Sequence, residues 1–336
     1  MSTESPGSHD EGAAVAALQD VYESIRQELA RIIVGQERIV RLLLACLLAR
    51  GHCLLIGVPG LAKTLLVKTL SQCLQLTFRR IQFTPDLMPA DIVGSEIIQE
   101  NEGRLDFEYQ SGPVFAHLVL ADEINRTPPK TQAALLEAMQ ERHVTVAGQT
   151  RDLPDPFLVV ATQNPIEQEG TYPLPEAQLD RFMFSLNVGY PDKPEEVEIV
   201  RRTTVRSLPE VTPCIRAEDI VNAQVLIQSA PVTDHVVDYA VEVAKATRPG
   251  DASAPQVTHD YVEWGAGPRA SQYLILGAKA VALLSGKLTP EIEHVREVAE
   301  PVLRHRVITN YRATGAGVSA DQVIEEILKT VPQESY

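Results

Sequence analysis

One segment constrains the fold of this chain more than any other: the loop of residues 57–64, Gly-Val-Pro-Gly-Leu-Ala-Lys-Thr. It follows the short apolar run of residues 52–56 and precedes a helical pattern that starts at Lys63. A glycine-containing loop between a buried strand and a helix surrounds a phosphate with backbone N–H groups, and the helix N-terminus adds partial positive charge. The loop therefore predicts a parallel α/β sheet with a phosphate site at its carboxyl edge.

The residue types in this loop each have a chemical role in nucleotide binding. We expect Lys63 to reach the β- and γ-phosphates of ATP and the Thr64 hydroxyl to bind Mg²⁺. Ala62 stands where the usual pattern has a second glycine; we expect it to lie in the helical region, with Gly60 relieving the crowding. The alternative is a glycine-rich turn without a ligand. The predicted nucleotide contacts are Gly57, Val58, Pro59, Gly60, Leu61, Ala62, Lys63, Thr64 and Leu65.

Two carboxylates end another apolar run. Residues 118–121 are followed by Asp122 and Glu123, although a buried strand has no packing reason to end in acids. Beside a phosphate loop, this pattern predicts that Asp122 binds Mg²⁺ and that Glu123 polarises the attacking water as general base. The run 157–162 leads into Asn164, whose amide we expect to orient that water or to contact the γ-phosphate. The alternatives are a solvated acidic loop and an asparagine that caps its strand.

The order of apolar patterns predicts two domains. In residues 15–190, strand-like runs alternate with helical segments, which indicates a parallel sheet covered by helices on both faces. Two stretches, at about residues 92–107 and 144–153, interrupt the alternation and are typical of β-hairpins. Residues 195–336 follow two prolines and have helical periodicity throughout, so we expect a smaller, all-helical domain there.

Composition is that of an ordinary soluble protein, with 44% hydrophobic and 22% charged residues. No apolar run approaches the roughly 20 residues that cross a bilayer, so no stable membrane insertion is expected. Residues 1–14 lack the features of a signal peptide and are predicted to be a disordered tail, which favours a cytoplasmic location. The net charge of −15 disfavours nucleic-acid partners. The four cysteines match no metal or disulfide pattern, and we expect buried, reduced thiols.

Two arginines are candidates for contacts with the γ-phosphate, because a guanidinium donates bidentate, charge-assisted hydrogen bonds. Arg181 precedes the last predicted strand, on the sheet edge away from its own phosphate loop, and is therefore predicted to serve a neighbouring subunit. The alternative is a surface ion pair with Asp180. Arg269 begins a helix, where a cation is disfavoured, and we expect it to reach ATP in the same subunit. Trp264, just before it, is expected in the core of the helical domain.

Together these motifs resemble those of the MoxR family of AAA+ ATPases. The resemblance rests on the runs GVPGLAKT, LVLADEINR, ATQNP, YPLPEAQLDRF and GAGPRA, and it covers roughly residues 32–331. Ala62 matches the family's own variant of the P-loop. The two predicted hairpins match insertions of the helix-2-insert clade, which includes magnesium-chelatase ATPase subunits. The implied fold is an AAA+ P-loop NTPase with a parallel sheet sandwiched by helices and a smaller helical lid.

The resemblance also implies roles for single residues. Asn164 corresponds to sensor 1, Arg181 to the arginine finger and Arg269 to sensor 2. Arg126 has two open interpretations, a contact at a subunit interface and an ion pair with an acid. The segment that the resemblance places near the adenine, where the residues alone predict only a turn, consists of Val34, Gly35 and Gln36.

The expected function is Mg-ATP hydrolysis by a chaperone-like ATPase that acts as a ring oligomer, a hexamer. The family is similar in this respect to remodelling ATPases that mature partner complexes together with von Willebrand factor A domain proteins. One alternative is a nucleotide-dependent assembly scaffold with little turnover. The presence of a complete catalytic set argues against it, namely Asp122, Glu123, Asn164 and Arg181. Another is a nucleic-acid motor, which the acidic net charge disfavours.

Overall fold

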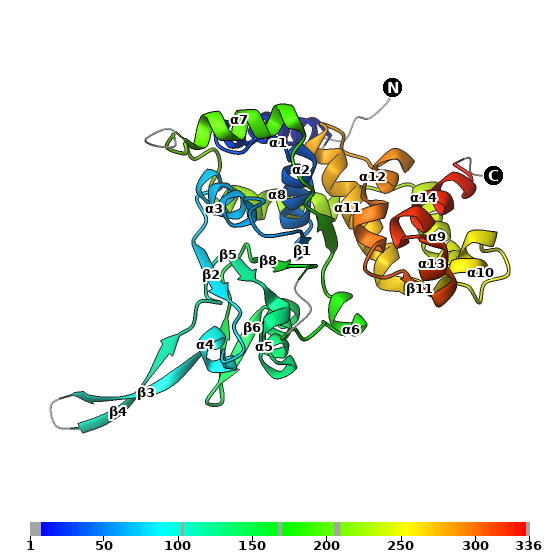
Figure 1. The fold of residues 1–336 in the computed structure, drawn as a ribbon. Coiled ribbons are helices and arrows are strands. Elements are labelled where there is room, and N and C mark those ends of the chain that lie inside the picture. Colours follow the sequence, from blue (N-terminus) through cyan, green and yellow to red (C-terminus); the bar gives the residue numbers. More distant parts are fainter. Residues whose placement is uncertain (1–7, 102–103, 167–169, 205–208, 334–336) are drawn as a thin grey trace.

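A five-stranded parallel sheet lies at the centre of the molecule (Figure 1). The computed structural model describes residues 8–101, 104–166, 170–204 and 209–333. The strand order β2-β5-β8-β1-β9 confirms the predicted parallel α/β class. Apart from the last residue of β1 and of β8, strands β1, β5 and β8 are buried along their length, as expected for parallel strands covered on both faces. The strands are β1 Cys53–Ile56, β2 Phe78–Gln82, β5 Leu118–Asp122, β8 Leu158–Gln163 and β9 Phe184–Asn187.

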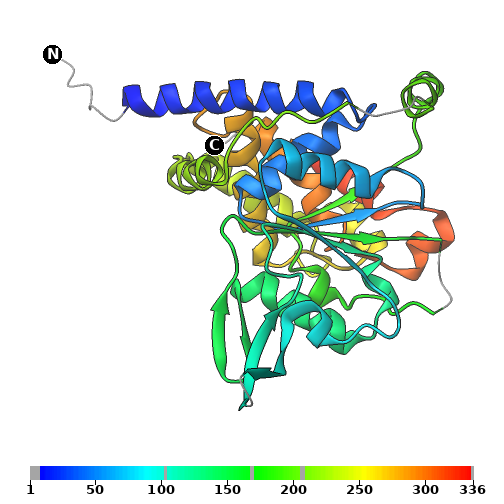
Figure 2. The same cartoon turned by 90° about the vertical axis from the view of Figure 1, so that its left-hand side faces the viewer.

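The two faces of the sheet contribute to two separate hydrophobic cores, because successive residues of a strand point in opposite directions. Leu55 and Leu120 belong to the core that includes α1, α2, α3 and the C-terminal helices. Leu54 and Val119 belong to the core that includes α4 and α5. In Figure 2 the blue helix α1 lies above the sheet, and the cyan and green hairpins lie below it. The helices are α1 Ser8–Ala30, α2 Glu37–Leu48, α3 Lys63–Cys73, α4 Pro89–Val93 and α5 Pro129–Glu141.

Two antiparallel hairpins extend from the sheet layer, and the longer one projects well away from the body (Figure 1). It pairs β3 Gly94–Asn101 with β4 Arg104–Ser111, so its second strand ends four residues beyond the predicted boundary at 107. The sequence also predicts a turn at Asn101-Glu102-Gly103; Asn101 ends β3, and the other two residues lie outside the described part of the chain. The shorter hairpin pairs β6 His143–Val146 with β7 Gln149–Asp152.

The first helix corrects one prediction. Because α1 begins at Ser8, a disordered tail over residues 1–14 is wrong for residues 8–14, and residues 1–7 lie outside the described part of the chain. The helix continues into a buried face that starts at Val15. Among the described residues, no helix combines the length and the apolar character that a membrane span requires.

The C-terminal region is a helical lid with one short antiparallel pair of strands. Helix α8 contacts α2 of the core, and Arg202 of α7 donates a hydrogen bond to the Ala30 carbonyl oxygen at 2.5 Å, so these two helices pack against the core. The strands, β10 and β11, are not indicated by the sequence pattern. The elements are α6 Glu176–Leu179, α7 Lys193–Thr203, α8 Ala217–Ser229, α9 Asp234–Ala246, α10 Gln256–Tyr261, β10 Val262–Trp264, α11 Pro268–Leu284, α12 Ile292–Leu303, β11 Ile308–Thr309, α13 Tyr311–Ala316 and α14 Ala320–Thr330.

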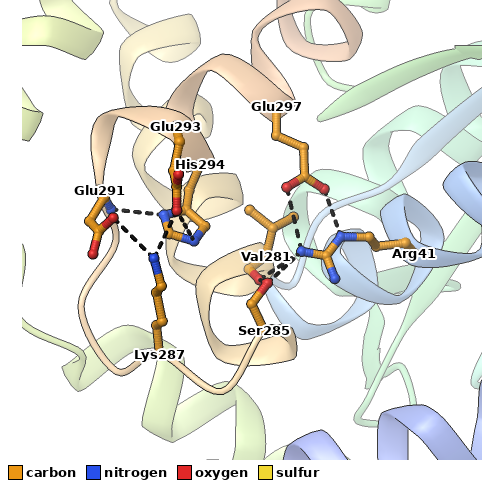
Figure 3. Close-up of polar contacts among 8 residues, drawn as sticks. All are labelled: Arg41, Val281, Ser285, Lys287, Glu291, Glu293, His294 and Glu297. Carbon is orange, nitrogen blue, oxygen red and sulfur yellow. Dashed lines mark hydrogen bonds and ion pairs between the residues drawn. The ribbon is translucent and has the colours of Figure 1, made fainter. Parts of the chain in front are cut away.

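Arg41 of α2 attaches the lid to the core (Figure 3). Its Nε donates to Glu297 Oε1 at 2.6 Å, and its Nη2 donates to Ser285 Oγ at 2.7 Å and to the Val281 carbonyl oxygen at 3.1 Å. One guanidinium thus connects α2 to the end of α11 and to α12. Because a charge-assisted fork has a fixed geometry, this contact sets the orientation of the lid on the core as well as its position.

Candidate functional site

The loop of residues 57–62 joins β1 to α3 at the carboxyl edge of the sheet. The Gly57 N–H donates to the Gln163 carbonyl oxygen of the neighbouring strand at 3.2 Å, and a Cβ at Gly57 would lie 2.8 Å from the Val188 carbonyl oxygen. Lys63 Nζ donates to the carbonyl oxygens of Gly57 and, at 3.3 Å, of Val58. Burial lowers the pKa of Lys63, while the charges of Asp122 and Glu123 act in the opposite direction. The loop therefore encloses the lysine head group beside the two acids.

The sequence predicts that Ala62 lies in the right-handed helical region, and the structure contradicts this. The φ of Ala62 is 54° and its ψ 20°, which places this N-cap residue of α3 in the left-handed region. A left-handed conformation costs a residue with a Cβ roughly 1–2 kcal/mol, which explains why a glycine is usual at this point of the loop. Gly60 is also left-handed, with a φ of 86°.

Asp122 lies at the end of β5 and is only 8% exposed. Thr162 Oγ1 donates to its Oδ1 at 2.7 Å, and Thr64 Oγ1 lies 3.5 Å from its Oδ2. The structure thus brings together the two predicted metal ligands, Thr64 and Asp122. Arg80 of β2 donates to the same Oδ2 from Nη2 at 2.7 Å and from Nε at 3.0 Å. The sequence analysis missed Arg80 and Thr162, because their role depends on which strands are neighbours.

Glu123 follows Asp122 in a left-handed conformation, with a φ of 58°. Its Oε2 accepts a hydrogen bond from Gln82 Nε2 at 3.0 Å and forms an ion pair with Arg126 Nη1 at 3.2 Å. The Glu123 N–H donates to Thr162 Oγ1 at 2.9 Å, so one threonine hydroxyl links both acids. Of the two interpretations of Arg126, the ion pair with an acid is observed, and Gln82 is a further contact that the sequence did not indicate.

Asn164 follows β8 and is 5% exposed. Because β8 lies between β5 and β1, this amide lies at the carboxyl edge between the acids and the loop. Its Oδ1 accepts a hydrogen bond from the Ile166 N–H at 3.2 Å, so the amide oxygen stabilises the turn after the strand. Asn164 therefore lies where a residue that faces the phosphates is expected, and its hydrogen bond with Ile166 is the contact expected of an asparagine that caps its strand.

A cavity of about 390 Å³ adjoins the loop, and its lining includes Val34, Gln36, Leu61, Ala62 and Leu65. Gln36 Nε2 donates to the Leu61 carbonyl oxygen at 3.3 Å, whereas its Oε1 is buried without a hydrogen-bond partner among the described residues. A buried acceptor without a donor is unusual. An apolar cavity of this size with one such acceptor fits a nucleoside base that carries an amino group.

Gly35 fixes the shape of the backbone beside this cavity. Its φ is 67°, and a Cβ there would lie 2.3 Å from Glu195 Oε1 of α7. The turn that the sequence predicted at residues 34–36 is therefore a close contact between the first two helices and α7. The φ at this position strains any residue that has a Cβ, which favours glycine.

Arg181 and Arg269 line a different cavity, at the amino edge of the sheet. His52, the residue before β1, also lines that cavity, whereas the phosphate loop follows β1. Five residues of extended chain separate the two ends by roughly 16 Å. The placement of Arg181 away from its own loop agrees with the prediction. Arg269, predicted to reach the loop of the same subunit, lies instead at this amino edge, where its Nη1 pairs with Asp180 Oδ2 at 3.0 Å.

The ion pairs of Asp180 also differ from the expected one. Its Oδ1 pairs with Arg306 Nε at 2.7 Å, and among the described residues it forms no ion pair with Arg181. Arg306 donates further hydrogen bonds to the carbonyl oxygens of Asp180 at 2.8 Å and of Phe182 at 2.7 Å. This buried guanidinium of the lid therefore holds the backbone on both sides of Arg181. Burial lowers the pKa of Arg306, and Asp180 acts against that shift.

Trp264 is 67% exposed, so its predicted place in the lid core is wrong. It lies in the three-residue strand β10, which pairs only with the two-residue strand β11. So small a sheet covers little side-chain surface, which agrees with the exposure of Trp264.

Comparisons with known proteins agree with this geometry. The family described as "ATPase family associated with various cellular activities (AAA)" matches residues 52–184, and the AAA lid domain matches residues 255–327. The chain is 46% identical to Chaperone MoxR1 of Mycobacterium tuberculosis, over 98% of this chain and 86% of that protein. This chain belongs to the MoxR family of AAA+ ATPases.

Two further proteins match over almost their whole length. Protein MoxR of Methylorubrum extorquens is 31% identical over 99% of both chains. A solved structure from Cytophaga hutchinsonii is 41% identical and superimposes with a TM-score of 0.89, covering 96% of this chain and 98% of that one. As a MoxR-family AAA+ protein, the chain binds a nucleotide and is an ATPase.

The lid of this MoxR-family ATPase contains one more group of potential metal ligands, Glu291, Glu293 and His294 (Figure 3). His294 Nδ1 accepts a hydrogen bond from the Glu291 N–H at 2.9 Å, so the neutral ring carries its proton on Nε2, toward Glu293. Lys287 Nζ pairs with Glu291 at 3.0 Å and with Glu293 at 2.8 Å. A protonated Nε2 and an ammonium between the carboxylates favour a network that stabilises the turn before α12 over a metal site.

Proposed function

We propose that this ATPase is a chaperone-like remodelling enzyme that hydrolyses Mg-ATP as a hexameric ring. One observation carries the proposal: the phosphate loop and the arginines Arg181 and Arg269 lie at opposite edges of the same sheet. A site that contains both halves requires a second copy, whose arginine edge meets the loop edge of the first. Repetition of this head-to-tail contact produces a closed ring when the rotation between copies closes.

The residues at the carboxyl edge have distinct tasks in the proposed reaction. The backbone of residues 57–62 and Lys63 hold the β- and γ-phosphates. Thr64 and Asp122 would hold Mg²⁺, which supplies charge neutralisation at the phosphates. Glu123 accepts a proton from the attacking water, and its contacts with Gln82 and Arg126 fix its carboxylate. Asn164 orients the same water from the neighbouring strand.

The base of the nucleotide belongs in the cavity beside Val34 and Gln36. Gln36 Oε1, which has no hydrogen-bond partner among the described residues, would accept a hydrogen bond from the adenine amino group, and the neighbouring Gly35 has a φ of 67° that favours glycine. A nucleotide in this position contacts α7, which begins the lid half of the chain. Nucleotide exchange is thereby coupled to the position of the lid.

A remodelling role is supported by the longer hairpin and by the names of relatives. Ile98, Leu105 and Phe107 are each more than 60% exposed on β3 and β4, which project from the body. Exposed apolar groups gathered on a projecting element are typical of protein contacts. The name of Chaperone MoxR1 agrees with this role. We extend the family resemblance to a von Willebrand factor A domain protein as partner, and the free cysteines support a reducing compartment such as the cytoplasm.

Mixing two inactive variants tests the proposal. Arg181→Ala should lower turnover by about 10³-fold or more, as expected for a guanidinium that acts on the γ-phosphate. Lys63→Ala should abolish binding at its own loop. Because each variant keeps the half that the other lacks, phosphate release should recover when the two are mixed and reassembled. Failure to recover, with hetero-oligomers verified by native mass spectrometry, would rule out the shared site.

A further inference from the structure

The cavity that contains Arg181 and Arg269 is lined by two further arginines, Arg50 and Arg142. This arginine cavity, of about 170 Å³, therefore collects guanidinium groups from four separate parts of the chain. Arg50 follows α2, Arg142 follows α5, Arg181 follows α6 and Arg269 begins α11. No motif of the sequence joins Arg50 and Arg142 to the other two. The fold alone brings the four together.

Positive charge is in excess in this cavity. Among the described residues, Asp155 pairs with Arg50 at 3.1 Å and lies 4.0 Å from Arg142, while Asp180 pairs with Arg269. Asp180 also neutralises the buried Arg306. Burial and the charge of Arg50 lower the pKa of Arg142 more than Asp155 raises it. Arg50 and Arg142 therefore repel each other, in a protein whose net charge is −15, and a bound anion would relieve this repulsion.

The backbone at both additional arginines has a conformation that favours glycine. Arg50 has a φ of 58° and Arg142 a φ of 57°, each just after the last turn of a helix. Glycine is the common residue at this position, because it has no Cβ to clash in the left-handed region. Side chains other than glycine in such a conformation cluster at ligand sites. Arg50 and Arg142 thus occupy two helix ends at which the left-handed backbone favours glycine.

We propose that Arg50 and Arg142 complete, with Arg181 and Arg269, a binding site for the polyphosphate chain of a nucleotide held by a second copy. Arg181 and Arg269 contact the terminal phosphate, and Arg50 and Arg142 bind the remaining negative charge at the rim. Guanidinium groups suit this ligand because each donates a planar pair of hydrogen bonds to phosphate oxygens. The inference rests on the proposed function, since it takes the shared site as given.

Kinetics of Arg142→Gln test this site in the assembled protein. We expect at least a tenfold loss of turnover, recovered by mixing with Lys63→Ala as for Arg181→Ala. Asp155→Asn is the decisive companion variant. If Arg142 acts only through its ion pair, Asp155→Asn will reproduce the loss and overturn the proposal. If Arg142 binds an anion, Asp155→Asn removes a competing negative charge and will leave turnover unchanged or higher. Arg201→Gln, which removes an exposed cation of α7, should have no effect.

Direct binding separates this inference from the ring proposal. Tripolyphosphate is titrated calorimetrically into Lys63→Ala protein, and we expect binding that falls at least tenfold when Arg142→Gln or Arg50→Gln is added. Circular dichroism verifies that each variant is folded. Equal binding by all variants overturns the site. If tripolyphosphate binding depends on the arginines but the mixing experiment fails, the anion site stands, its ligand is a free polyphosphate, and the shared nucleotide site is wrong. If mixing succeeds with Arg181→Ala and Arg142→Gln retains full turnover, only the extension to Arg50 and Arg142 fails.

Discussion

The two ends of strand β1 carry opposite chemistry. The phosphate loop with its backbone N–H groups lies at the carboxyl end, beside the acids Asp122 and Glu123. Guanidinium groups gather at the amino end, around His52. Strand length alone separates these ends by roughly 16 Å. The difference places the two halves of the proposed shared site at opposite edges of the sheet, too far apart to meet within one subunit.

The two ends are also held in place by different parts of the molecule. At the carboxyl end, Thr162 links Asp122 and Glu123 within the sheet itself. At the amino end, the lid residue Arg306 holds Asp180 and the backbone next to Arg181. If the proposed shared site is correct, a movement of the lid would displace the arginine half, leave the acids in position, and so couple the lid of one subunit to hydrolysis in its neighbour.

The largest effect is expected at the carboxyl end. Glu123→Gln preserves the size of the side chain and removes the base, so phosphate release should fall by about 10²–10⁴-fold, the range for loss of general-base catalysis. Binding of a fluorescent ATP analogue should stay within a few-fold of wild type, because the loop and Asp122 are unchanged. Glu141→Gln, an exposed acid at the end of α5, is the matched control. Turnover within threefold of wild type for Glu123→Gln would exclude Glu123 as the base.

Local patterns were sufficient to predict the carboxyl end. The loop, the acid pair and Asn164 each follow an apolar run, so neighbouring residues suffice to predict their position at strand ends. Arg80 and Thr162 were missed because they contact Asp122 through strand pairings that the chain order does not reveal. Ala62 shows a second limit, since a residue type does not determine its own φ. The amino end depends on contacts such as Asp180 with Arg306, 126 positions apart, which no local pattern contains.

At the amino end, Arg306→Met tests the dependence of the arginine half on the lid. Removal of one partner from a fully buried ion pair typically costs about 3–5 kcal/mol. Because the Asp180 side chain is 34% exposed and keeps Arg269 as a partner, we expect a loss at or below the lower end of that range. Urea denaturation should show this loss of stability. At temperatures where the variant is folded, turnover should fall while nucleotide binding at its own loop persists.

Lys329→Met removes an exposed lid cation whose partners, Glu325 and Glu326, are also exposed, so it should lower stability only slightly and leave turnover unchanged. Loss of nucleotide binding in Arg306→Met, with the fold retained, would contradict a role confined to the amino end.

His52 makes the amino end sensitive to acid. Its Nε2–H donates to the Met139 carbonyl oxygen at 3.0 Å and its Nδ1 accepts from the Val159 N–H at 3.0 Å. Burial lowers its pKa from 6.5 to about 4. The unfolded chain binds a proton below pH 6.5 and the folded chain only near pH 4, so this histidine stabilises the fold above pH 6.5 and loses that contribution as the pH falls to 4.

The loss should reach about 3 kcal/mol at pH 4. Urea midpoints of wild type and His52→Gln, measured from pH 7 to 4.5, isolate this contribution, because all other groups titrate in both proteins. Parallel curves for the two proteins would show that His52 is not buried in its neutral form.

The smallest effect concerns a feature that both ends share, a left-handed residue other than glycine. Ala62→Gly at the carboxyl end relieves strain of roughly 1–2 kcal/mol and adds about 0.4–1 kcal/mol of unfolded-chain entropy, so we expect a net stabilisation between about 0 and 1.6 kcal/mol. Turnover should stay within twofold, because the Ala62 methyl group contributes no charge or hydrogen bond.

Arg142→Gly relieves the same strain at the amino end but also removes a guanidinium, so it should gain no more stability than Ala62→Gly and should lose turnover. Equal turnover in both variants, each compared with wild type by phosphate release and thermal unfolding, would mean that the left-handed arginine is as dispensable as the alanine. Lower turnover in Arg142→Gly than in Ala62→Gly would show that turnover depends on the side chain of Arg142 and not on that of Ala62, although both residues have the same backbone conformation.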